Sequence, residues 1–137
     1  MASIEVTKDF PLSAGDVWSW IGDTGAVAAW IPAIDASRMD GDVRHVVFTD
    51  GAPARERIVA FDEEARTYSY EYIDGPLPLE HYRSTISVMA VGDDTCSVHW
   101  SAKFGAESAT VEAELATAIE GIYAAALDEL ATKAVPA

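Results

Sequence analysis

The sequence predicts an α+β fold in which an antiparallel sheet of about seven strands is followed by a long C-terminal helix. Three patterns support this prediction. Apolar and polar residues alternate over 2–10 and through most of 43–104, and apolar residues recur at spacings of three and four over 108–133. The 137 residues are expected to form one domain spanning 1–137, because domains most often hold about 100–150 residues.

Two short helices are expected directly after the first strand. Residues 2–10 alternate as a half-buried strand does, and Ser13 is followed three residues later by Asp16. This pair resembles a capping box with Asp in place of Glu, so it predicts a helix that stops near Gly22. A second short helix is expected over about 24–30.

The middle of the chain is predicted to be consecutive strands separated by turns rich in Gly, Pro and Asp. Residues 43–49, 54–61 and 95–104 each have the length and composition of a strand. The clearest alternation lies in 95–104, where every second residue from Cys96 to Phe104 is apolar. This pattern is typical of antiparallel strands with one buried face.

A tyrosine-rich hairpin is the centre of this region. Residues 68–72 and 81–88 have strand alternation and are joined by a Pro/Gly turn. If the hairpin is symmetric about Pro76, Tyr70 and Tyr82 are cross-strand neighbours. Two phenols that converge on one face indicate a pocket wall rather than a dry core.

The C-terminal segment 108–133 is predicted to be a helix about 39 Å long at 1.5 Å per residue. Its inward face is expected to carry Val111, Leu115, Ile119, Ile122, Tyr123, Ala126 and Leu130. Gly121 interrupts it at a cost of about 1 kcal/mol relative to Ala. The close approach of a ligand or a strand would explain a glycine there.

Charge and composition limit the partners. The net charge of −14 argues against binding to nucleic acid or an anionic membrane, because both would repel the chain. The single cysteine, Cys96, excludes an intramolecular disulfide. The sequence shows no signal peptide and no apolar run of about 20 residues, so we expect a cytoplasmic protein, either a monomer or a homodimer.

No cofactor or metal is expected. Strand parity places His45, His81 and His99 opposite the inward face of their strands, and none has metal-ligand spacing with another His or with Cys96. The chain also lacks a Gly-rich phosphate-binding loop. Any catalysis is therefore expected to be free of cofactors.

The order of strand, two short helices, about six strands and one long helix resembles the helix-grip fold of the START-like or Bet v 1-like proteins. These form the SRPBCC superfamily, which includes polyketide cyclase/dehydrase-like proteins. The resemblance covers the whole chain. It implies a curved sheet wrapped around the C-terminal helix, with a cavity for a hydrophobic small molecule between them.

Four stretches are similar to the plant lachrymatory factor synthase group within this superfamily: 41–44, 54–62, 68–70 and 80–82. That group rearranges a small alkenyl sulfenic acid and places an arginine, a glutamate and two tyrosines in its cavity. The resemblance implies catalytic roles for the matching Arg44, Glu56, Tyr70 and Tyr82. The turn 50–54 is also similar to the gate loop of plant abscisic-acid receptors. The linker before Ala54 is shorter than in the plant enzyme, so the substrate is not carried over.

The residues themselves allow acid/base chemistry. Arg44 shares its strand face with Val46 and Phe48, which predicts an inward guanidinium, whereas alternation leaves the direction of Glu56 open. If Glu56 points inward, its carboxylate can move protons on a substrate while Arg44 and the phenols stabilise an oxyanion. The competing interpretation is that Arg44 and Glu56 form a structural salt bridge.

Further side chains are expected to contact the ligand: Trp30, Val46, Phe48, Pro53, Ile58, Tyr68, Tyr72, Ser84, Trp100, Ile119, Ile122 and Tyr123. Three functions follow from these expectations. The first is a cofactor-free isomerase, lyase or cyclase that acts on a small hydrophobic substrate. The second is a carrier for such a molecule, and the third is a module that binds another protein when its ligand is present.

Overall fold

The computed structural model describes residues 1–134, so the last three positions of the predicted domain lie outside the described residues. Seven antiparallel strands form one sheet in the order β1-β7-β6-β5-β4-β3-β2. The strands are β1 (Ala2–Phe10), β2 (Ile34–Asp40), β3 (Val43–Phe48), β4 (Pro53–Asp62), β5 (Thr67–Asp74), β6 (Glu80–Gly92) and β7 (Thr95–Gly105). The helices are α1 (Ala14–Ile21), the 3-10 helix η1 (Thr24–Ala29) and α2 (Ala109–Lys133).

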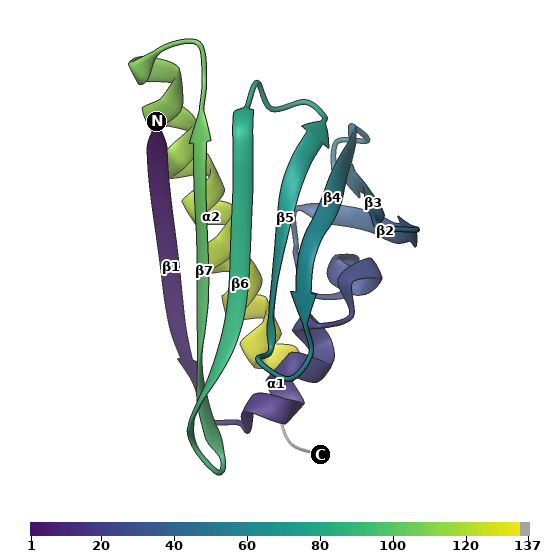
Figure 1. Cartoon of the computed structure of the whole chain (residues 1–137), viewed down its shortest axis with the longest axis vertical. Coiled ribbons are helices and arrows are strands. Elements are labelled where there is room, and N and C mark those ends of the chain that lie inside the picture. The colour runs from purple at the N-terminus through teal and green to yellow at the C-terminus, as the bar shows by residue number, and fades with distance from the viewer. Residues whose placement is uncertain (135–137) are drawn as a thin grey trace.

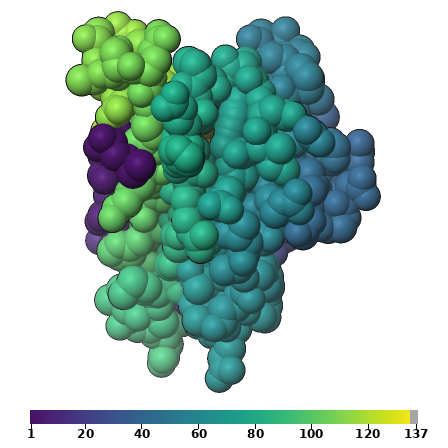
Figure 2. Space-filling model, turned by 45° about the horizontal axis from the view of Figure 1, so that its top comes forward, coloured from purple at the N-terminus to yellow at the C-terminus, as the bar shows by residue number. Residues whose placement is uncertain are grey.

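The sheet curves around α2, α1 lies near the C-terminal end of α2, and η1 lies beside β2 (Figure 1). Neighbouring strands are consecutive in the chain except at one place, where β1 pairs with β7 in full register from Ala2 opposite Phe104 to Phe10 opposite Cys96. This arrangement confirms the predicted α+β helix-grip fold. The start of α2, the β5–β6 connection and the β3–β4 turn lie at the same end of the molecule (Figures 1 and 2).

Local signals fix both helices that follow β1. The Ser13 hydroxyl accepts a hydrogen bond from the Asp16 backbone N–H at 3.1 Å, which confirms the predicted cap of α1. The second short helix has 3-10 rather than α geometry, with a kink at Ala26. Its backbone is tied to β2 by Ser37, whose hydroxyl donates to the Gly25 carbonyl at 2.8 Å and accepts from the Ala28 N–H at 3.0 Å.

The register of the tyrosine hairpin differs from the expected one. Tyr70 pairs with Ser84 rather than with Tyr82, so the hairpin is centred on Leu77 and not on Pro76. The β6 strand is irregular at its start, where His81 has a φ of +54° and the pairing with β7 shifts between Glu80 and Arg83. The rings of Tyr70 and Tyr82 nevertheless remain neighbours, with centroids 6.2 Å apart.

Helix α2 supplies the part of the core that lies under the sheet. Its buried side chains are Leu115, Ile119, Tyr123, Ala126, Leu127 and Leu130. The expectation for Gly121 is wrong, because this glycine is exposed and a Cβ added there would meet no atom within 4 Å. No neighbouring strand therefore requires a glycine at this position.

Truncation of Leu127 to Ala should lower the free energy of unfolding by about 2–5 kcal/mol, because the side chain is fully buried between α2 and the sheet. Chemical denaturation followed by circular dichroism measures the change. Glu120→Ala, on the exposed side of the same helix, is the matched control and should change stability by no more than about 0.5 kcal/mol. Equal effects of the two substitutions would contradict the described packing of α2.

Candidate functional site

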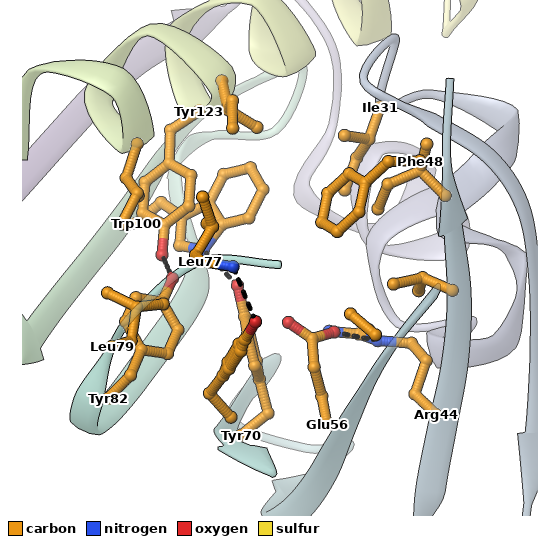
Figure 3. Close-up of a pocket in the computed structure, with 16 residues that line it drawn as sticks. Ile31, Arg44, Phe48, Glu56, Tyr70, Leu77, Leu79, Tyr82, Trp100 and Tyr123 are labelled. Carbon is orange, nitrogen blue, oxygen red and sulfur yellow. Dashed lines mark hydrogen bonds and ion pairs between the residues drawn. The ribbon is translucent and has the colours of Figure 1, made fainter. Parts of the chain in front are cut away.

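An apolar cavity lies between the concave face of the sheet and helix α2. The volume of this cavity is about 70 Å³. Its walls are Ile31, Ile34, Arg44, Val46, Phe48, Ala54, Glu56, Tyr70, Tyr72, Leu77, Leu79, Tyr82, Trp100, Ile119, Ile122 and Tyr123 (Figure 3). Arg44 and Glu56 are the only two of these sixteen whose side chains are charged at neutral pH. The rest of the lining is apolar or carries a neutral phenol or indole.

Arg44 and Glu56 form an ion pair across β3 and β4, where they are direct register partners. The Nε of Arg44 donates to Oε1 of Glu56 at 2.9 Å, and the two side chains are 3% and 20% exposed. Figure 3 shows the Glu56 carboxylate between Arg44 on one side and the tyrosines on the other. Glu56 therefore points inward, which alternation along β4 left open.

The remaining contacts of Arg44 are also internal. Its Nη1 donates to the Thr24 carbonyl and to the Tyr68 hydroxyl, each at 3.1 Å. Its guanidinium carbon lies 4.7 Å from the ring centroid of Tyr70, which is a cation–π distance. Burial opposes the charged form, but Tyr68, Glu56 and Tyr70 outweigh it and raise the pKa of Arg44, so the guanidinium stays charged.

A hydrogen-bonded cluster of hydroxyls forms the opposite wall. The Tyr123 hydroxyl bonds those of Tyr82 and Ser84, the latter at 2.8 Å. The indole N–H of Trp100 donates to Ser84 at 3.1 Å and to Tyr70 at 3.3 Å. Trp100 also stacks on Tyr123, with ring centroids 3.9 Å apart and planes inclined by 6°. Three strands and helix α2 thus meet in one polar cluster.

The phenols of this cluster remain neutral at physiological pH. Burial, aided by the negative charge of Glu56, raises the pKa of Tyr70 to about 12. Burial also raises the pKa of Tyr82 and of Tyr123 well above the ordinary value of 10. These groups therefore act in the cavity as hydrogen-bond donors or acceptors and not as phenolates.

The structure brings most of the predicted site residues to the cavity. Arg44, Glu56, Tyr70 and Tyr82 line it, together with Val46, Phe48, Tyr72, Trp100, Ile119, Ile122 and Tyr123. Five residues predicted to contact a ligand lie outside the lining: Trp30, Pro53, Ile58, Tyr68 and Ser84.

Packing explains these five positions. Tyr68 and Ser84 are buried behind the wall, where they bond Arg44 and Tyr123. Trp30 is also buried and packs against the indole of Trp100 at 5.6 Å between centroids. Pro53 is exposed at the start of β4, whereas Ile58 is half-buried opposite the inward Tyr70 and packs against the core outside the cavity lining.

Five lining residues are not among the predicted site residues: Ile31, Ile34, Ala54, Leu77 and Leu79. The two leucines lie in the β5–β6 connection, which is fixed by a hydrogen bond of 3.1 Å from the Leu77 N–H to the Tyr72 hydroxyl. Gly75 has a φ of +158° there, and a Cβ at this position would collide with that hydroxyl. Two leucines inside a Pro-rich turn were an available signal, because exposed turns seldom alternate apolar residues.

Within residues 1–134 no three His, Cys, Asp or Glu side chains gather as metal ligands do. His81 is exposed, and His45 and His99 are half-buried; none of the three lines the cavity. In the same part of the chain, no helix has the length and apolar character needed to cross a membrane.

A curved antiparallel sheet that holds a C-terminal helix across an apolar cavity defines a START-like, Bet v 1-like protein. The chain belongs to the family described as polyketide cyclase / dehydrase and lipid transport, whose model matches residues 1–135. No curated protein matches the chain.

Solved structures agree with this assignment. The protein XoxI from Bacillus cereus is 31% identical, with a TM-score of 0.91 over 97% of this chain and 95% of that one. The Zhui aromatase/cyclase from Streptomyces sp. R1128 is 14% identical, with a TM-score of 0.84 over 97% and 93%. Truncated norcoclaurine synthase from Thalictrum flavum is 20% identical, with a TM-score of 0.78 over 99% and 94%. The last two likenesses show the fold alone.

Replacing Arg44 by Met should destabilise the protein by about 3–5 kcal/mol, because it leaves Glu56 without its partner in a largely apolar site. Arg57→Met breaks the ion pair with Asp42, whose two side chains are 49% and 60% exposed, and should cost at most about 1 kcal/mol. Urea denaturation of both variants at neutral pH measures the difference. Similar losses in the two variants would show that burial adds nothing to the pair at Arg44.

Stability should also fall in alkaline solution because the pKa of Tyr70 is raised from 10 to about 12. Between these values the unfolded chain releases a proton that the folded protein keeps. The contribution of the neutral phenol is therefore complete below pH 10 and is lost as the pH rises through about 12. In denaturant titrations over this range, Tyr70→Phe should show a shallower decline than the unchanged protein. An identical slope would contradict the burial of an un-ionised Tyr70.

Proposed function

We propose that this protein binds a small hydrophobic molecule in the cavity and acts on it by acid/base chemistry without a cofactor, as an isomerase, lyase or cyclase. Its family and its fold support the binding of a hydrophobic ligand. The observation that favours catalysis is the position of Glu56. Its carboxylate is held by Arg44 at 2.9 Å and faces a cavity whose other walls are almost wholly uncharged.

The proposed reaction is a proton transfer within the bound substrate. The Glu56 carboxylate takes a proton from an acidic C–H or O–H of the substrate and returns it at another position. Negative charge that develops on a substrate oxygen is stabilised by the hydrogen bond that Tyr70 donates. Arg44 does not need to contact the substrate, because its part is to fix the orientation of Glu56 and to balance its charge.

The cavity also supports the second function, that of a carrier. The observation in its favour is that Arg44 makes its hydrogen bonds to Glu56, Thr24 and Tyr68 within the protein, as a structural ion pair would. A carrier needs only the apolar walls and the shape of the cavity. The cytoplasmic location and the choice between monomer and homodimer remain predictions from the sequence.

Substitution of Glu56 by Gln separates the two functions. The amide keeps the size of the side chain but cannot accept a proton as a carboxylate does. An enzyme should lose at least about a hundredfold in turnover, in line with the usual contribution of a general base, while binding to the ligand changes little. Candidate substrates come from a thermal-shift screen of small carbonyl compounds, aromatic polyketides and fatty acids.

The matched control is Glu71→Gln, because Glu71 lies on the convex face of β5 and its side chain forms an ion pair only with the exposed Arg83, at 3.8 Å, within residues 1–134. Its turnover should equal that of the unchanged protein. If Glu56→Gln retains full turnover, the proposed base is wrong. If no compound shifts the melting temperature, the ligand-binding proposal itself fails.

A further inference from the structure

The hydroxyl cluster beside the cavity has a fixed direction of hydrogen bonding. A serine or tyrosine hydroxyl carries one hydrogen, and a backbone carbonyl can only accept. The Ser84 hydroxyl lies 3.0 Å from the Ser101 carbonyl, and all of its contacts can be hydrogen bonds together only if its single hydrogen points there. Ser84 must then accept from its other two partners, Trp100 Nε1 at 3.1 Å and the Tyr123 hydroxyl at 2.8 Å.

The direction of the hydrogen bonds at Ser84 also fixes the direction at Tyr123 and Tyr82, which line the cavity. Because Tyr123 donates its only hydrogen to Ser84, it must accept the hydrogen of Tyr82, whose hydroxyl lies next to it (Figure 3). The Tyr82 oxygen therefore has lone pairs but no hydrogen left for a ligand. Tyr70 has the opposite character, since its oxygen accepts from the Trp100 N–H at 3.3 Å and its own hydrogen can be donated either to the neighbouring Tyr82 oxygen or to a ligand.

Neighbouring tyrosines thus present one donor and one acceptor, with ring centroids 6.2 Å apart. We propose that Tyr70 and Tyr82 together recognise a hydroxyl group, such as that of a phenol or an enol, on a neutral and otherwise apolar ligand. A hydroxyl can accept from Tyr70 and donate to Tyr82 at the same time. This inference rests on the proposed ligand-binding function and names the chemical class that the site prefers.

Two other groups satisfy this pair less well. An aldehyde or ketone oxygen can accept from Tyr70, but it would face the lone pairs of Tyr82 without a hydrogen to share. A carboxylate meets the same lone pairs and also the Glu56 carboxylate. The positive charge of Arg44 is already balanced by Glu56, so the buried anion would have no unpaired cation in the lining. Tyr82 is therefore a residue that determines specificity.

The test uses four compounds that share one ring and one alkyl group: 4-ethylphenol, 4-ethylbenzaldehyde, 4-ethylbenzoate and ethylbenzene. Affinities are measured by calorimetry or NMR titration with the unchanged protein. We expect the phenol to bind about tenfold more tightly than the aldehyde, which corresponds to one hydrogen bond gained and one lone-pair clash avoided. The benzoate should bind at least as weakly as the aldehyde.

Two substitutions test the direction of the cluster. Tyr82→Phe should weaken the binding of 4-ethylphenol several-fold and leave that of ethylbenzene unchanged. Ser84→Ala removes the acceptor that orients Tyr123, so that Tyr82 can donate to a ligand, and the preference for phenol over aldehyde should shrink toward equality. Ser69→Ala is the control, since Ser69 bonds Thr85 at 2.7 Å on the other face of the sheet and should leave the preference intact.

Each outcome decides the proposal. It is overturned if the aldehyde or the benzoate binds as tightly as the phenol, or if folded Ser84→Ala keeps the full preference. Melting curves of the variants show whether they are folded. If none of the four compounds binds, the ligand-binding function proposed above fails as well. If the compounds bind without preference, only the proposal that Tyr70 and Tyr82 recognise a hydroxyl group is overturned.

Discussion

The buried guanidinium of Arg44 is the constraint on which the architecture around the cavity depends. A charge that is 3% exposed must be paired, because its desolvation would otherwise cost several kcal/mol. Its partners come from three elements besides its own strand: Glu56 from β4, the Thr24 carbonyl from η1, and Tyr68 from β5. The same contacts therefore set the spacing of those elements, the inward turn of Glu56 and the position of the short helix beside the sheet.

The walls of the cavity differ in their chemistry. One side carries a compensated ion pair, and the other carries neutral hydroxyls whose pKa values are raised by burial. Apolar side chains from the sheet, α2 and the β5–β6 connection close the remaining sides. Such a site can lower the free energy of a small polar change within a hydrophobic molecule, because few competing charges or solvent contacts remain.

Much of this architecture could be predicted because its signals are local and periodic. The alternation in β7, the cap at Ser13 and the spacing of Leu115 and Ile119 each act within a few residues. The errors arose where alternation is interrupted or cannot separate core from cavity. The irregular backbone at His81 gave Tyr70 a different register partner, and Ile58 lies on the inward side of β4 but packs against the core outside the cavity lining.

Trp100 has a consequence for how the protein can be observed. It lines the cavity and stacks on Tyr123, whereas Trp18, Trp20 and Trp30 do not belong to the lining. A molecule that enters the cavity would contact one indole and leave the surroundings of the other three largely unchanged. The protein thus contains its own optical probe, and a change in its tryptophan emission would report occupancy of the cavity without any label.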